Sequence, residues 1–165
     1  MSRIRTDQLL IPSLLDRLLD EEPDVSVELP KQRAQKLREL KQSVKRDLEY
    51  LLNTRVSLRY FPEDFKNVET SVLNFGIPDF SGVAMGSKKQ QELLRERVES
   101  AVVRFETRFK EVHVELVIDP DNTLQRSIRF RIDGILHAEP APEPVVFDSI
   151  LSPVVGEFVV REDGA

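Results

Sequence analysis

The period of the hydrophobic pattern changes along this chain, and that change limits the possible folds more than any other feature. Two early stretches repeat apolar residues at helical spacings, whereas the last third alternates apolar and polar residues as strands do. The apolar positions of the first stretch, residues 31–53, are Leu37, Leu40, Val44, Leu48 and Leu51. Those of the second are Leu94, Val98, Ala101, Val102, Phe105 and Phe109. The order predicts an α+β fold, with two long helices and short helices packed on a small antiparallel sheet formed by the C-terminal third.

The strand pattern recurs in separate segments of that last third. Residues 112–118 alternate apolar and polar side chains, and residues 119–122 have turn chemistry. Residues 128–133 alternate apolar side chains with Arg129, Arg131 and Asp133, as a half-buried antiparallel strand does. Residues 145–147 and 157–161 can extend the same sheet.

Helix-end signals support this division. Ser87 and Gln90 have the Ser-x-x-Gln spacing of a capping box, which predicts the start of the second long helix. Gly76 is predicted to close a preceding helical turn in the left-handed region, and Pro78 prevents continuation. Pro30 fits the first turn of the first long helix.

The N-terminal residues 1–29 are expected to form an arm with a short helix, and residues 30–165 a single domain. Ser13 can cap that helix, whose leucines form one apolar stripe. A helix this short is not stable alone. It therefore either packs on its own domain or serves as an arm for a partner.

Composition excludes several function classes. The 165 residues include 24 Lys and Arg and 29 Asp and Glu, a net charge of −5, which argues against a nucleic-acid-binding surface. The absence of Cys excludes disulfides, Cys-ligated zinc and thiol nucleophiles, and two His leave little for a metal site, so we predict no cofactor. No apolar run approaches the ~20 residues of a membrane span, and no secretory segment opens the chain. We expect a soluble, cytoplasmic protein without membrane insertion.

Glu106 is the most informative carboxylate, because the end of a helix carries partial negative charge and a carboxylate there needs a compensating cation. Arg104 and Arg108 lie close in sequence. One interpretation is a local ion pair, and the other is that Glu106 and Arg108 present paired charges to another subunit. Because Glu106 lies off the apolar stripe, we expect Glu106→Ala to spare the fold and weaken assembly.

The predicted second strand carries a row of arginines that has two interpretations. Arg129 and Arg131, with Arg126 before them, can belong to an ordinary mixed-charge sheet face that Asp133 helps to balance. They can also contact a partner. Single-stranded nucleic-acid binding would need aromatic residues between the cations, and Phe130 points to the opposite face.

A hydrolase that uses two carboxylates is the main enzymatic alternative. Such an enzyme holds an acid and a second carboxylate roughly 5–9.5 Å apart across a sugar-binding cleft. Glu106, Asp119 and Asp121 are candidates, but no spacing selects a pair among them. The chain has no Trp and only two Tyr to stack on sugar rings.

Three ordered segments resemble a known family: residues 14–18 (Leu-Leu-Asp-Arg-Leu), 71–79 (Ser-Val-Leu-Asn-Phe-Gly-Ile-Pro-Asp) and 105–109 (Phe-Glu-Thr-Arg-Phe). They are similar to TssE, a family of type VI secretion baseplate proteins related to the lysozyme-like-named wedge subunit of contractile phage tails. The resemblance runs from about residue 12 to residue 136. The family signature Glu-Pro-Arg matches Glu106 and Arg108, with Thr107 in place of the proline.

The resemblance implies a structural, non-enzymatic role. Such proteins join the baseplate wedge beside TssF and TssG, with TssK as a further partner, at the inner face of the cytoplasmic membrane. Their sheet is similar to the strand-exchange part of the sheath proteins TssB and TssC, so the baseplate seeds the sheath by offering a strand edge. The partner-binding residues expected here are Glu106, Arg108, Arg104, Arg129 and Arg131. The competing hypothesis is a peptidoglycan-cleaving, lysozyme-like hydrolase.

Overall fold

The predicted α+β architecture is confirmed. The computed structural model describes residues 13–19, 24, 32–56, 64–79, 87–117, 128–138, 141–152 and 157–162. The helices are α1 (Leu14–Leu18), α2 (Arg33–Asn53) and α3 (Lys88–Phe105), with the 3₁₀ turns η1 (Lys66–Val68) and η2 (Val72–Asn74). The strands are β1 (Phe109–Val117), β2 (Ile128–Leu136), β3 (Glu143–Ser152) and β4 (Glu157–Glu162). None of the described helices is long and apolar enough to cross a membrane.

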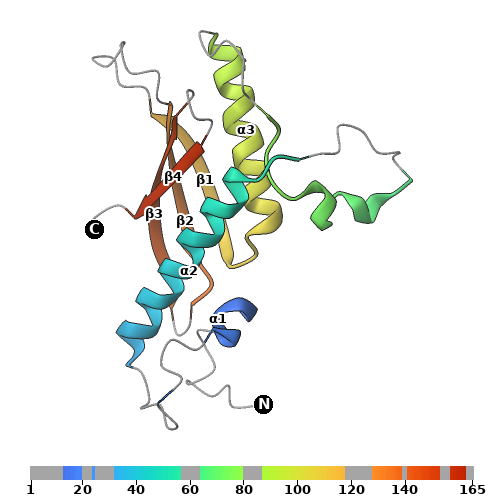
Figure 1. Cartoon of the computed structure of the whole chain (residues 1–165). Helices are drawn as coiled ribbons and strands as arrows, with labels where there is room; N and C mark the ends of the chain where they lie inside the picture. The colour runs from blue at the N-terminus through green and yellow to red at the C-terminus, as the bar shows by residue number, and fades with distance from the viewer. Residues whose placement is uncertain are drawn as a thin grey trace.

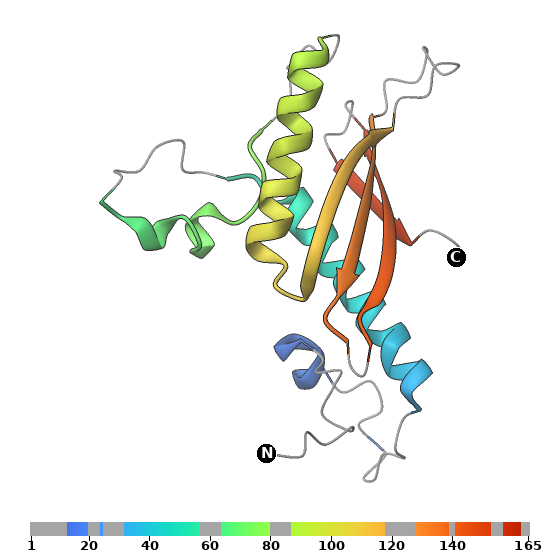
Figure 2. The same cartoon turned by 180° about the vertical axis from the view of Figure 1, so that it is seen from behind.

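The four strands form an antiparallel meander in the order β1-β2-β3-β4, so β1 and β4 are its edges. Helix α2 crosses one face of the sheet, and α3 lies beside β1 (Figure 1). The opposite face is seen in Figure 2, where no described helix covers it. Helix α2 therefore covers one face of the sheet, and α3 covers the margin at β1.

The core lies between α2, α3 and the covered face of the sheet. Both predicted helical stripes contribute to it, although Leu37 and Phe105 are only partly buried. Apart from Phe109, the buried apolar strand residues are Val114, Phe130, Ile132, Leu136, Val145, Phe147, Leu151, Phe158 and Val160. These positions alternate along each strand, as expected for a sheet with one covered face.

The second helical stripe ends earlier than predicted. Phe109 was expected to continue it, but α3 ends at Phe105 and Phe109 begins β1. Its ring lies against Gly134 of β2, where an added Cβ would be 2.4 Å from the ring carbon Cε1. The ring of Phe109 can lie there only because Gly134 has no side chain. This contact between neighbouring strands cannot be inferred from helical spacing.

Helix ends and loops test the other local predictions. Ser87 is the N-cap of α3, but its side chain makes no capping bond. The backbone carbonyl of Ser87 accepts the amides of Gln90 and Gln91 instead, so the predicted capping box is wrong. Pro30, residues 119–122 and Ile118 lie outside the described residues.

The prediction for Gly76 is confirmed, because this residue has a φ of +113°. It follows η2 and leads into a short parallel bridge between Arg55 and Ile77. A Cβ at Gly76 would lie 2.3 Å from the carbonyl oxygen of Thr54. Glycine therefore lets the chain that follows α2 and the chain that follows η2 lie side by side.

Gly76→Ala is expected to destabilise the protein by about 2 kcal/mol or more, because it adds backbone strain at positive φ to a clash with the Thr54 carbonyl. Urea denaturation followed by circular dichroism measures this loss. Val72→Ala is the matched control in the same segment, since Val72 is 88% exposed. Equal midpoints for the two variants would contradict the strained turn.

Candidate interaction site

Glu106 and Arg108 form a local ion pair at the end of α3. Glu106 is the C-cap residue and is only 7% exposed. Arg108 donates from Nε to Glu106 Oε1 at 2.7 Å and from Nη2 to Oε2. The backbone amide of Arg108 donates to the same Oε1 at 3.1 Å. Thr107 lies between the two residues and is exposed, so the pair forms with threonine at this position.

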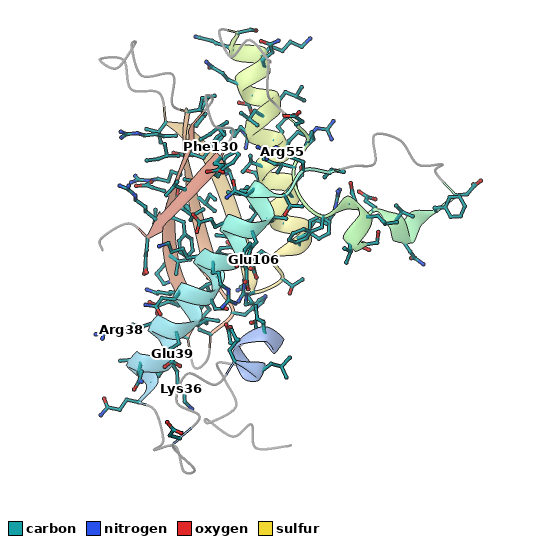
Figure 3. All side chains as sticks on the ribbon, viewed as in Figure 1. Lys36, Arg38, Glu39, Arg55, Glu106 and Phe130 are labelled. Carbon is teal, nitrogen blue, oxygen red and sulfur yellow. The ribbon has the colours of Figure 1, made fainter. Side chains whose placement is uncertain are left out.

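Arg108 also joins this turn to α2. Its Nη1 donates to Ser43 Oγ at 2.8 Å, and its Nη2 donates to Asp47 Oδ2 at 2.7 Å. Figure 3 shows Glu106 close to α2, inside the molecule. Burial lowers the pKa of Arg108, but the hydrogen bonds and charges of Glu106 and Asp47 outweigh it and raise that pKa above its usual value. The guanidinium therefore remains a cation in its half-buried position.

The same network continues to the N-terminal helix. Asp16 of α1 accepts hydrogen bonds from Ser43 Oγ at 2.5 Å and from Arg46 Nη1 at 2.7 Å. Arg46 also binds Asp47. We call these residues the charged cluster: Asp16, Ser43, Arg46, Asp47, Glu106 and Arg108. It connects α1, α2 and the turn between α3 and β1.

The side chain of Asp16 hydrogen-bonds to α2, whereas Leu15 and Leu18 of α1 and the following Leu19 are exposed. Ser13 and Asp16 form a capping box at the start of α1. Leu15, Leu18 and Leu19 are 47%, 75% and 58% exposed. The sequence drew attention to the apolar stripe, but the hydrogen bonds that join α1 to α2 are those of Asp16 with Ser43 and Arg46.

The pKa of Asp16 makes this contact sensitive to acid. Partial burial raises the pKa, but hydrogen bonds from Ser43, Ser13 and Arg46, with the charge of Arg46, lower it from 3.8 to about 2. A depressed folded-state pKa gives stability that is present above the unfolded value and is lost as pH falls toward the folded value.

We expect Asp16→Asn to lower the free energy of unfolding by about 1–2 kcal/mol above pH ~4. The difference from wild type should shrink between pH ~4 and ~2 and vanish below that, as Asp16 itself takes up a proton. Chemical denaturation at a series of pH values measures it, and Asp64→Asn, at an exposed position, controls for the lost charge. A difference that persists unchanged at pH 2 would contradict the assignment.

The five predicted partner-binding residues lie in three places. Glu106 and Arg108 are in the charged cluster. Arg104 binds Glu69, before η2, at 2.5 Å. Arg129 and Arg131 lie on the uncovered face of the sheet, where Arg131 binds Asp148 at 3.4 Å. The structure contradicts the basis on which Glu106→Ala was expected to spare the fold, because Glu106 is interior.

The uncovered face carries a row of alternating charge across all four strands. In register, Glu115 pairs with Arg131, Arg131 with Asp148, and Asp148 with Arg161. Phe130 is fully buried on the other face, as predicted. This is the mixed-charge face that the sequence suggested, and Arg126 lies outside the described residues.

Helix side chains bind the backbone of each edge strand, two of them at one residue of β1 and one at one residue of β4. On β1, the amide of Val114 donates to Glu99 Oε2 at 3.0 Å, and Arg95 Nη1 donates to the Val114 carbonyl at 3.2 Å. On β4, Asn53 binds both the amide and the carbonyl of Phe158. Sequence reasoning missed these contacts. The expected strand edge is therefore already occupied by the protein's own side chains at Val114 and at Phe158.

Of the three candidate carboxylates of a hydrolase, the structure describes only Glu106. Both oxygens of Glu106 accept from Arg108, and Asp119 and Asp121 lie outside the described residues. Within the described part of the chain, no group of three or more His, Asp or Glu side chains is arranged to hold a metal ion.

Comparison with known families places these features in context. The model of the family described as baseplate wedge protein gp25 matches residues 38–141, which is more than half of the chain. The match includes most of α2, all of α3 and the first two strands, together with two of the three resembling segments. No curated protein and no solved structure matches the chain significantly. The chain belongs to the family of baseplate wedge protein gp25.

Proposed function

We propose that this protein is the TssE-type subunit of a type VI secretion baseplate. It joins the wedge beside TssF and TssG, with TssK as a further candidate partner, at the inner face of the cytoplasmic membrane. It helps to seed the sheath of TssB and TssC by pairing a sheet edge with a strand of another chain. The observation that carries this proposal is a four-stranded meander with two edge strands in a member of a baseplate wedge family.

Edge pairing has a simple physical basis. An edge strand presents backbone donors and acceptors that a second chain can bind, and alternate side chains set the register. On β1 the groups of Val112 and Leu116 point the same way as those of Val114, because hydrogen-bonded and non-hydrogen-bonded pairs alternate in an antiparallel ladder. Residues two positions from each helix-bound residue therefore still point their backbone groups outward, as strand addition requires.

The charged residues contribute to the wedge contact in two ways. Arg129 is exposed on the uncovered sheet face, and Arg104 and Arg131 each hold an acidic side chain at the surface. These three arginines are suited to direct contact, where charge complementarity specifies partner and orientation. Glu106 and Arg108 support the contact indirectly, since they fix the turn between α3 and β1.

Copurification tests the proposal. Tagged full-length protein expressed in cells that carry the secretion machine should recover TssF, TssG and sheath subunits. Arg129→Glu should reduce recovery of the wedge proteins, while Arg97→Glu, the same charge change at an exposed position of α3, should not. Recovery of neither wedge nor sheath subunits by the wild-type chain would overturn the proposal.

A peptidoglycan turbidity assay separates this proposal from the hydrolase alternative. We expect no lysis of purified cell wall, because Arg108 already occupies both oxygens of the buried Glu106 carboxylate. Robust lysis that Glu106→Gln abolishes would instead favour the enzyme.

A further inference from the structure

The two edge strands differ in how strongly helix side chains bind their backbone groups, at Val114 of β1 and at Phe158 of β4. At β1, the two residues that bind Val114 are both charged, and they bind each other through Arg95 Nη1 and Glu99 Oε2 at 2.8 Å. Arg95 is bound a second time by Glu92 at 2.7 Å. Freeing Val114 means disrupting an ionic network along α3, which packs beside this strand (Figures 1 and 2).

At β4, a single uncharged side chain binds the described edge backbone, while Lys41 of α2 lies 3.7 Å from the carboxylate of Glu162, a contact with that side chain and not with the backbone. The Phe158 amide donates to Asn53 Oδ1 at 2.8 Å, and Asn53 Nδ2 donates to the Phe158 carbonyl at 2.9 Å. The carboxamide supplies one acceptor and one donor, as the C=O and N–H of a single residue in an antiparallel neighbouring strand do. Asn53 is the last residue of α2 and is exposed, so its side chain can turn into water when a strand arrives. The backbone N–H and C=O of one residue in an incoming antiparallel strand would replace its two hydrogen bonds one for one.

We propose that β4 is the edge that receives a strand, and that Asn53 is a displaceable gate on that edge. This inference rests on the proposed function and names the site and the chemistry of the strand. Beyond Phe158, the alternation of the ladder directs the backbone groups of Val160 and Glu162 away from β3. The receiving edge therefore spans Phe158, Val160 and Glu162, with the gate at its first position.

The charge row specifies what the incoming strand carries. Across the uncovered face the signs alternate from Glu115 to Arg131, Asp148 and Arg161, so the next position opposite Arg161 favours an acidic residue. No carboxylate among the described residues lies within ion-pair distance of Arg161.

The neighbouring row adds a second requirement. Val159 lies beside Ile150 in register and is 46% exposed, so the position opposite Val159 favours an apolar residue. The other side of the incoming strand would lie next to the buried Phe158 and Val160. The partner is thus an extended segment with an acidic and an apolar residue two positions apart on one face and apolar residues on the other.

A blocked synthetic peptide of that pattern tests the edge assignment. One face of the peptide carries only valines, and the other face carries a glutamate and a valine two positions apart. Amide hydrogen exchange of the full-length protein, read by NMR, should slow at Val160 and Glu162 when the peptide is added. Slowing at Val112 and Leu116 instead would overturn the assignment to β4 and leave the proposed function standing. Slowing at neither edge would overturn it as well, and copurification of sheath subunits then decides whether the proposed function also fails.

Variants test the gate and the charge rule separately. Asn53→Ala should tighten peptide binding about three- to tenfold, because two competing hydrogen bonds are gone. Arg161→Glu should weaken binding by about two- to fivefold, and a peptide with lysine in place of glutamate should restore it. Arg97→Glu is the matched control and should not change the affinity for the glutamate peptide or for the lysine peptide. Circular dichroism checks that each variant is folded. Unchanged affinity in Asn53→Ala would overturn the gate, and failure of the charge swap to restore binding would overturn the strand chemistry.

Discussion

Val102→Asp is expected to abolish cooperative folding. Val102 is completely buried in α3, among the apolar residues that α3 contributes to the core. An ionised carboxylate placed there has no cation to pair with, and its burial costs several kcal/mol in addition to the lost packing. Since domains of this size are stable by only about 5–15 kcal/mol, the native state should no longer dominate.

The next residue provides the control. Val103 is 60% exposed on the same helix, so Val103→Asp makes the same chemical change in water. Thermal unfolding followed by circular dichroism should show a wild-type-like transition for Val103→Asp and none for Val102→Asp. A cooperative transition near the wild-type midpoint in Val102→Asp would show that the α3 stripe is not the core.

Arg108→Ala should cost about 3–5 kcal/mol of stability, because removing one partner of a buried ion pair leaves the other uncompensated. The stranded group is Glu106, which is only 7% exposed, and Asp47 loses a hydrogen bond at 2.7 Å as well. Arg104→Ala is the control. Its ion pair with Glu69 lies at the surface, so its loss should cost less than about 1 kcal/mol.

Urea denaturation of both variants measures the difference. The double variant Glu106→Leu with Arg108→Met should recover much of the loss, since it replaces both charges with apolar groups of similar size. If Arg108→Ala were no less stable than Arg104→Ala, the charged cluster would not be a structural element.

The sequence predicted those parts of the fold that depend on local periodicity. Leu40, Val44 and Leu48 recur at helical spacing and are buried in α2 as expected. Phe130 and Ile132 alternate with Arg129 and Arg131, and the strand buries one set and exposes or half-exposes the other. Gly76 marked its turn because positive φ is a property of single residues.

The features that sequence reasoning missed depend on contacts between distant segments. Glu106 looked like a surface charge because nothing in its neighbourhood reveals that Asp47 and Ser43 lie beside Arg108. Asn53 was interpreted only as the end of a helix, since its role follows from the end of α2 lying next to β4. The exposed leucines of α1 are a further example, because an apolar stripe in a sequence does not identify the surface that it contacts.

These observations give the charged cluster and the sheet edges different roles. The cluster ties α1, α2 and the turn before β1 into one unit, and so keeps the sheet in a fixed relation to the N-terminal helix. In the proposed function, the edges offer backbone groups to a strand of another chain. Stability and assembly can therefore be altered separately, the first at Arg108 and the second at the edge strands.

Hydrogen–deuterium exchange of this protein within purified baseplates, with and without bound sheath, tests strand pairing most directly. The account predicts that amides of an edge strand, β4 in the further inference, exchange more slowly once the sheath is bound, while those of the central strands β2 and β3 do not change. Unchanged exchange along both β1 and β4 in the sheath-bound assembly would contradict it.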